Sequence, residues 1–157
     1  MKLESRNYQE GNYEQYIQSL TKNNMQKLFL ENFGGWSDEV SKNKFFKVLD
    51  TGFVQLFFLE DNFIGYVSFN VERDHKNSYL INDIHLENKF QRKGYGTEIL
   101  NFVEEKVKEL KGNRLKVFVF KANPSLNFYK KVGFKEMEYI EHSKTNILIR
   151  EIKYDSL

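Results

Sequence analysis

The sequence predicts an α+β fold (mixed α/β), with helices packed on a central, mostly antiparallel sheet. Two stretches with helical periodicity come first, and three strand-like segments follow them. Helical and strand-like segments then alternate along the rest of the chain. Residues 114–120 carry apolar side chains on both faces, which is typical of a strand in the middle of a sheet. The length of 157 residues suits one core, and we expect a single domain over residues 1–157.

The N-terminal third is expected to contain a short strand and two helices. Residues 2–6 are expected to form the strand. Asn12 can cap a first helix, in which apolar residues recur three and four positions apart until Gly34-Gly35 ends it. Ser37 can cap the second helix, because two acidic residues follow it and suit the positive end of a helix dipole.

The remaining segments alternate between strands and helices. A tight Asp61-Asn62 turn between two apolar runs predicts a hairpin. A polar loop over residues 72–78 follows, in which Glu72 and His75 are expected to be solvated. The expected elements are strands at 54–59, 63–71 and 79–86, a helix at 95–111, a strand at 114–120, a helix at 124–132, and strands near 139–142 and 146–152.

Composition places the chain among soluble globular proteins and excludes several functions. Hydrophobic residues make up 40% and charged residues 29% of the chain. The net charge of +2 is too small to indicate a nucleic-acid partner. The absence of cysteine excludes disulfides, thiolate metal sites and a cysteine nucleophile. The first ten residues lack the apolar core of an export signal and no long apolar run follows, so we expect a cytoplasmic protein without a membrane partner.

A glycine-containing turn between a strand and a helix is the most informative segment. Residues 91–97 read Gln-Arg-Lys-Gly-Tyr-Gly-Thr. A helix N-terminus offers unpaired N–H groups and positive charge to a phosphate, and glycines let the backbone approach it. A Walker loop is excluded because it requires Gly-Lys-Ser/Thr, and here Thr97-Glu98 follows Gly96. A dinucleotide fingerprint is excluded because Ile99 replaces its third glycine. A turn without any ligand explains the pattern equally well.

A second segment, residues 123–134, is explained by helix capping alone. Asn123 suits the N-cap of a short helix, Pro124 its first turn, and Gly133 its left-handed C-terminal position. Tyr129 lies on the same face as apolar residues of this helix, so a core position is one interpretation of it.

Together the two segments resemble signatures of the GNAT superfamily of N-acetyltransferases. The first is similar to the Gln/Arg-x-x-Gly-x-Gly/Ala signature, and the second to a segment with an asparagine, a tyrosine and a closing Gly-Phe. The resemblance is clear from about residue 54 to 135 and implies acetyl-CoA as cosubstrate, with its pantetheine arm between two diverging strands. The cofactor contacts it implies are Ile84, His85, Leu86, Gln91, Arg92, Lys93, Gly94, Tyr95, Gly96, Thr97, Asn123 and Tyr129.

The resemblance implies transfer of the acetyl group to a primary amine of a small molecule or protein by direct attack. The backbone N–H of Leu86 would polarise the thioester carbonyl, and Tyr129 would stabilise charge on the leaving sulfur. The alternative is a GNAT-fold protein that binds CoA without turnover, as a regulatory subunit or sensor. No metal is expected. Homodimers are common in the family, so a homodimer is an open alternative to a monomer.

The residue that takes up the amine proton is the open point. Members of the family place a glutamate or histidines on the strand before the phosphate loop. The matching positions are Leu80 and Asn82, and neither side chain can take up a proton. Asn82 can orient a water that relays it. Asp83 and His85 are expected to face the other side of the strand unless a bulge intervenes.

Aromatic residues mark where the acceptor amine is expected to bind. Phe33 and Trp36 fall at the break between the first two helices and can line a pocket, although a hydrophobic plug explains them equally well. Tyr139 is a further candidate near the C-terminal hairpin. His142 is expected in a strand of that hairpin and has no assigned role.

Overall fold

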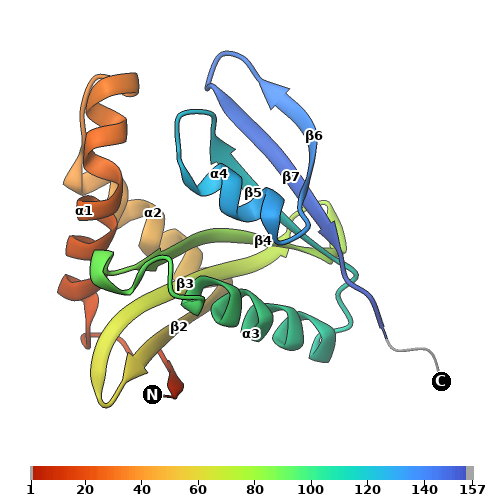
Figure 1. Cartoon of the computed structure of the whole chain (residues 1–157), viewed down its shortest axis with the longest axis horizontal. Coiled ribbons are helices and arrows are strands. Elements are labelled where there is room, and N and C mark those ends of the chain that lie inside the picture. Colours follow the sequence, from red (N-terminus) through yellow and green to blue (C-terminus); the bar gives the residue numbers. More distant parts are fainter. Residues whose placement is uncertain (1, 155–157) are drawn as a thin grey trace.

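The structure is a computed structural model that describes residues 2–154. Seven strands form one sheet in the order β1-β2-β3-β4-β5-β7-β6, and helices pack on it (Figure 1). Every neighbouring pair is antiparallel except β4 and β5, so the predicted α+β class is confirmed. The elements are β1 (Leu3–Asn7), α1 (Glu14–Phe33), α2 (Asp38–Thr51), β2 (Gly52–Leu59), β3 (Asn62–Glu72), β4 (His75–Leu86), η1 (Asn88–Phe90), α3 (Tyr95–Glu109), β5 (Arg114–Phe120), α4 (Ser125–Lys131), β6 (Lys135–Ile140) and β7 (Thr145–Glu151).

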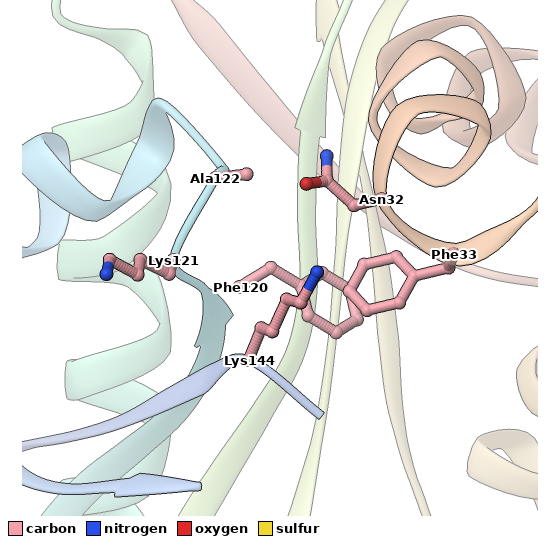
Figure 2. A pocket seen from close by; sticks show the side chains of 6 residues that line it. All are labelled: Asn32, Phe33, Phe120, Lys121, Ala122 and Lys144. Atoms are coloured by element: carbon pink, nitrogen blue, oxygen red, sulfur yellow. The ribbon is translucent and has the colours of Figure 1, made fainter. Parts of the chain in front are cut away.

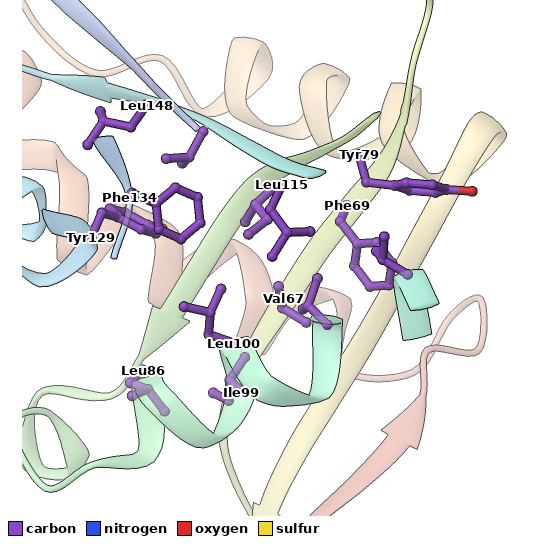
Figure 3. Close-up of a cluster of buried hydrophobic side chains, with 14 of the residues drawn as sticks. Val67, Phe69, Tyr79, Leu86, Ile99, Leu100, Leu115, Tyr129, Phe134 and Leu148 are labelled. Carbon is purple, nitrogen blue, oxygen red and sulfur yellow. The ribbon is translucent and has the colours of Figure 1, made fainter. Parts of the chain in front are cut away.

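Two hydrophobic clusters lie on opposite faces of the sheet. Along β2, Phe57 belongs to one cluster, and its neighbours Leu56 and Phe58 belong to the other. Successive side chains of a strand point to opposite faces, so the clusters are separated by the sheet. The first cluster includes residues of α3 and α4 (Figure 3), and the second packs against α1 and α2. Within residues 2–154, no helix is both long and apolar enough to cross a membrane.

Strands β4 and β5 pair with each other only at one end. Residues 78–81 of β4 pair with residues 114–117 of β5, in parallel. Beyond this point the two strands diverge, toward the left and the top of Figure 1. Residues 82–86 and 118–120 therefore border an interruption in the hydrogen-bonded sheet, which we call the split. The splayed strands that the resemblance implies are present.

Helix α1 begins at Glu14, and the predicted cap Asn12 does not cap it. Tyr13 occupies the position before the helix, in the left-handed region with φ 62° and without a side-chain capping bond. Its ring stacks on Phe63 of β3, with 5.7 Å between the ring centroids. Packing on the sheet, which local sequence does not reveal, therefore determines the start of the helix. The predicted cap of α2 is confirmed, because Ser37 Oγ accepts an N–H of the first turn at 3.2 Å.

In the β2–β3 and β3–β4 hairpins, the turns lie at other residues than the sequence predicts. Glu60 and Asp61, with φ 49° and 66°, form the first turn, one residue earlier than predicted. Glu72 pairs with His75 across the second turn, so most of the predicted loop is strand. The prediction that Glu72 is solvated is wrong: its side chain is 13% exposed and lies 3.4 Å from the ammonium of Lys116. His75 is exposed, as expected.

The C-terminal hairpin starts earlier in the chain than predicted. Strand β6 begins at Lys135, and all but its last residue are exposed. It is an edge strand, and edge strands often lack the apolar alternation by which a strand is recognised in sequence. His142 lies in the turn between β6 and β7, and not in a strand as predicted.

Candidate functional site

The backbone of β4 faces the split at Ile84 and Leu86. The N–H of Glu87 donates to the carbonyl of Ile64 on β3 at 2.8 Å. Backbone groups of successive strand residues point to opposite sides, so the N–H and C=O of Leu86 point away from β3. By the same alternation Ile84 faces the split and His85 faces β3. Two of the three expected cofactor contacts on this strand therefore turn their backbone toward the split.

Two side chains hold the carbonyl oxygen of Leu86. Gln91 Nε2 donates to it at 2.9 Å, and Asn24 Nδ2 donates to it at 3.1 Å. Gln91 begins the predicted phosphate loop, so this bond ties the loop to the end of β4. Asn24 comes from α1, so the other bond ties that helix to the same peptide. The N–H of Leu86 is the donor expected to polarise a thioester carbonyl.

A β-bulge at Asn82 changes which side chains of β4 face α1. The register with β3 steps from Ile81 to Asp83 and skips Asn82. Ile81 is buried in the cluster beside α3, whereas His85, an even number of residues later, contacts Asn24 of α1. Asp83 and His85 therefore share the α1 face with Asn82. The expectation that they point to the other face fails because of this bulge.

Asp83 and His85 form a hydrogen-bonded pair on that face. His85 Nε2 lies 3.3 Å from Asp83 Oδ1, and the two side chains are 8% and 26% exposed. Burial alone would raise the pKa of the Asp83 carboxyl. The hydrogen bond from His85 and the charge of Lys44 outweigh it, so the pKa lies below its usual value. Asp83 is therefore a carboxylate at neutral pH. Within residues 2–154, no three metal-ligating side chains come together.

Tyr129 of α4 is buried at the other side of the split. Its ring packs against Phe128 and Phe134, with centroids 5.2 and 5.4 Å away. Burial and the negative charge of Asp83 raise the pKa of the Tyr129 phenol above its ordinary value. The two groups are thus close enough to interact electrostatically. Among residues 2–154, no hydrogen bond contributes to this shift, so the hydroxyl is available to a ligand.

The predicted phosphate loop presents an open helix end. Helix α3 begins at Tyr95, and Gly94 before it has φ 91° and no side-chain capping bond. A Cβ at Gly94 would meet no atom of the described residues within 4 Å, so the first N–H groups of α3 remain uncovered. Arg92 and Lys93 are exposed beside them. Glycine is favoured at position 96 for a different reason. A Cβ added there would lie 3.3 Å from the ring of Phe128, so Gly96 allows α3 to pack closely on α4.

Two asparagines of the predicted site use their carboxamides in local structure. Asn123 Oδ1 accepts the N–H of Ser125 at 2.9 Å, whereas the N-cap position of α4 itself is occupied by Pro124, one residue later than predicted. Its Nδ2 faces the sulfur of Met25 on α1 at 3.9 Å. Asn82 Nδ2 donates to Asn70 Oδ1 at 2.8 Å, so the oxygen of Asn82 is the atom through which it can hold a water.

Aromatic side chains gather where α1 meets the end of β5. Phe33 packs on Phe120 with 4.7 Å between centroids, and both line a cavity of about 280 Å³ (Figure 2). Trp36 packs edge-on against Phe29 and does not line this cavity. Tyr139 lies outside it and is 43% exposed on β6. The other lining residues are Asn32, Lys121, Ala122 and Lys144.

Sequence reasoning missed Asn24, which no motif marks within the apolar stripe of α1. It also misplaced the pair formed by Asp83 and His85. One signal was present in the strand: Asn82 and Asp83 are consecutive polar residues between Ile81 and Ile84. Two polar neighbours inside an apolar strand break its alternation, which is typical of a bulge.

Comparisons with known proteins agree with this geometry. The model of the acetyltransferase (GNAT) family matches residues 22–134. No curated protein matches the sequence. PaiA N-acetyltransferase from Thermoplasma acidophilum, solved with coenzyme A, has a TM-score of 0.77 at 17% identity over 96% of this chain and 99% of that chain. An acetyltransferase from Bacillus subtilis, solved with CoA, has a TM-score of 0.73 at 18% identity over 97% and 100%. A GNAT family acetyltransferase from Elizabethkingia anophelis, with acetyl-CoA bound, has a TM-score of 0.71 at 18% identity over 95% and 97%.

Proposed function

The chain belongs to the GNAT family of acetyltransferases, and from that premise we propose that it transfers the acetyl group of acetyl-CoA to a primary amine. The acceptor is an amine of a small molecule or a protein. One observation carries the proposal: the split in the sheet is bordered by the Leu86 backbone, the Asp83 carboxylate and the Tyr129 phenol. These are the three kinds of group that an acyl transfer from a thioester requires.

The residues around the split fit acetyl-CoA. The uncovered N-terminus of α3, with Arg92 and Lys93 beside it, suits a diphosphate. The backbone of Gln91 to Thr97 would hold that diphosphate. The split-facing backbone of Ile84 would bind an amide of the pantetheine arm as a neighbouring strand does, which leaves the N–H of Leu86 for the thioester. When bound, acetyl-CoA supplies the acetyl group as an activated thioester.

Each group at the split has a separate task. The N–H of Leu86 donates to the carbonyl oxygen as negative charge develops on it. The hydroxyl of Tyr129 donates to the sulfur as it leaves; because its pKa is raised, stabilisation of the charge describes this role better than full proton transfer. Asp83 takes up the amine proton, directly or through a water that Asn82 orients. An amine with a pKa of about 10.4 is neutral in only roughly four molecules in ten thousand at pH 7, so this proton matters.

The acceptor would approach from the α1 face of the sheet. Asp83 and His85 face α1, and Phe120, at the end of β5 that does not pair with β4, contacts Phe29 and Phe33 of that helix. The cavity beside Phe33 therefore opens on the same face as the carboxylate. Phe33 would contact the acceptor in this cavity, and Trp36 and Tyr139 would contact only an acceptor that extends beyond it.

The proposal is tested by placing a negatively charged side chain in the phosphate loop. In Gly94→Glu a carboxylate replaces the open approach to α3, and we expect CoA affinity to fall below detection in calorimetry. Gly34→Glu is the matched control, because Gly34 also has positive φ, φ 84°, and open space at its Cβ, at the end of α1. It carries the same backbone strain, about 1–2 kcal/mol, away from the loop. Unchanged CoA affinity in Gly94→Glu would refute the loop assignment.

Turnover is tested separately with acetyl-CoA and a panel of primary amines. Release of the CoA thiol reports transfer, and the chain has no cysteine to add background. A binding protein without turnover is the second candidate, and the lowered pKa of Asp83 favours it, since a weakly basic carboxylate is a poor proton acceptor. Acetyl-CoA at 100 times its Kd would then stabilise the fold by about 2.7 kcal/mol without thiol release for any amine.

A further inference from the structure

We propose that Asn24 of α1 is a positioning residue for the acyl transfer. A single nitrogen of its side chain selects the tautomer through which His85 donates to Asp83, and also anchors the Leu86 peptide that faces the split. The inference rests on the proposed function, because it assigns Asn24 to the same reaction. Neither the family signatures nor the pattern of α1 points to this residue.

The orientation of the Asn24 carboxamide follows from the Leu86 carbonyl. That oxygen can only accept a hydrogen bond, so the atom of Asn24 that lies 3.1 Å from it must be the NH₂ group. The same NH₂ group lies 3.1 Å from His85 Nδ1. Because the NH₂ group is only a donor, Nδ1 must be the unprotonated, accepting nitrogen of the imidazole. The ring proton is therefore on Nε2, which donates to Asp83.

The selected tautomer determines what Asp83 can offer. With the proton on Nε2, the carboxylate accepts a hydrogen bond on Oδ1 and stays ionised, while Oδ2 is available to an amine or a water. With the proton on Nδ1, the imidazole would present a lone pair to the carboxylate and repel it. The groups that face Asp83 from the packed elements are His85, Lys44 of α2, Tyr66 of β3 and Tyr129 of α4.

The same nitrogen acts on the other half of the reaction. The Leu86 carbonyl and the Leu86 N–H belong to adjacent peptide groups but point to the same side of the strand, so a bond that holds the carbonyl also fixes the direction of the N–H. The Leu86 carbonyl receives such bonds from Asn24 and from Gln91. Asn24 thereby links the proton acceptor on one side of β4 to the backbone that faces the split on the other. Helix α1 supplies this link, although it contributes no group to the thioester itself.

The tautomer can be tested without any acceptor amine. In the intact wild-type protein, ¹⁵N chemical shifts of the His85 ring should show a proton on Nε2 and an unprotonated Nδ1. In Asn24→Asp the carboxylate can only accept, so we expect the proton on Nδ1 as well, or on Nδ1 alone. Asn23→Asp is the matched control, because Asn23 is the exposed neighbour on the same helix. Its His85 shifts should equal those of the wild type. A proton on Nδ1 in the wild type would overturn the proposal.

Kinetics test whether this positioning matters for the reaction. With an accepted amine, we expect kcat of Asn24→Asp to fall about 10- to 100-fold, the range for loss of the hydrogen bond from His85 to the charged Asp83 carboxylate, with KM for acetyl-CoA changed by about twofold at most. Asn24→Gln, which keeps the donor, should recover part of the loss. If Asn24→Asp has the kcat of Asn23→Asp, Asn24 has no positioning role. If the wild type acetylates no amine, the proposed function fails, and the ¹⁵N shifts still decide the tautomer.

Discussion

The two ends of β4 each carry a polar network, and they differ in how completely it is paired. At the end where β4 pairs with β5, Glu72 accepts from Ser78 at 2.5 Å, and Lys116 lies 3.4 Å away. Arg114 donates to Ser78 at 2.8 Å and lies 4.0 Å from Glu72. These side chains come from β3, β4 and β5 and are at most 25% exposed where they form ion pairs. The side chains of this network link three strands through hydrogen bonds and ion pairs.

At the split, the polar network contains hydrogen-bonding groups that are not fully paired. Among residues 2–154, Asp83 accepts one side-chain hydrogen bond, from His85, and no hydrogen bond contributes to the pKa shift of Tyr129. The comparison shows that the presence of polar side chains alone does not distinguish a functional site from a structural network in this sheet. A network whose charges are already paired stabilises the fold, whereas one with free acceptors and donors can bind and react.

The largest expected effect is at the split, in Asp83→Asn. The amide keeps the shape of the side chain and can still accept from His85, but it cannot take up a proton. We expect kcat to fall about 10²- to 10³-fold, while the thermal midpoint changes little. Steady-state rates with a saturating amine measure it. If the variant keeps the wild-type kcat, the carboxylate is not the proton acceptor, and a water held by Asn82 would have to act alone.

Tyr129→Phe removes the donor on the opposite side of the split. The ring continues to pack between Phe128 and Phe134, so the fold should be unaffected. We expect kcat to fall about 10- to 100-fold through the loss of one hydrogen bond to a developing charge. A faster-leaving thiol in the acyl donor should reduce this loss, because less charge then needs stabilising. If Tyr129→Phe lowers kcat by the same factor with acetyl-CoA and with the acyl donor that has the faster-leaving thiol, the proposed role of Tyr129 is contradicted.

The paired network is expected to respond in stability instead. Glu72→Ala leaves Arg114 and Lys116 without their shared carboxylate, and we expect the free energy of unfolding to fall by about 1–3 kcal/mol. Urea unfolding followed by circular dichroism measures it. The kcat per folded molecule should stay at the wild-type value. A loss of kcat without a loss of stability would remove the contrast between the two ends of β4.

The smallest effect is expected from pH. The pKa of Asp83 is lowered, so its ionised form is present above the usual carboxyl pKa of about 3.9. Any stability that this shift contributes is lost only as pH falls through the lowered value. The pKa of Tyr129 is raised, so its proton remains up to at least about pH 10. Rates between about pH 7.5 and 9.5, divided by the neutral fraction of the amine, should therefore be constant. Two amines of different pKa should each give a corrected rate that does not change with pH.

Most of the fold could be predicted from the sequence, because its elements repeat local patterns. The periodicity of α1 and α3, the Ser37 cap and the two-sided strand at 114–120 are all local signals, and each appears in the structure. Strand β6 is an exposed edge without alternation, and Tyr13 begins α1 through a contact with a distant strand. Neither effect is visible in a short window of sequence.

The candidate site was predictable only where a motif marks it. The Gln91 to Gly96 loop is tied to the end of β4 through Gln91, and the role of this loop and of the Asn123 to Tyr129 segment in binding the cofactor stays a prediction. The proposed proton acceptor was not predictable, because the face of Asp83 depends on one extra residue in β4. Asn24 was not predictable either, since its bond to Leu86 joins residues 62 positions apart in the chain.

The bulge at Asn82 has a consequence for how this protein is aligned with its relatives. Counting forward from the β3–β4 turn and counting backward from Gln91 assign opposite faces to Asp83, because the two counts differ by the skipped residue. With a relative that lacks the bulge, an ungapped alignment through this strand would therefore pair the wrong side chains. An insertion or deletion of one residue here would move the Asp83 carboxylate to the other face of β4 while the neighbouring residues stay the same. This strand can therefore diversify by insertion and deletion as well as by substitution.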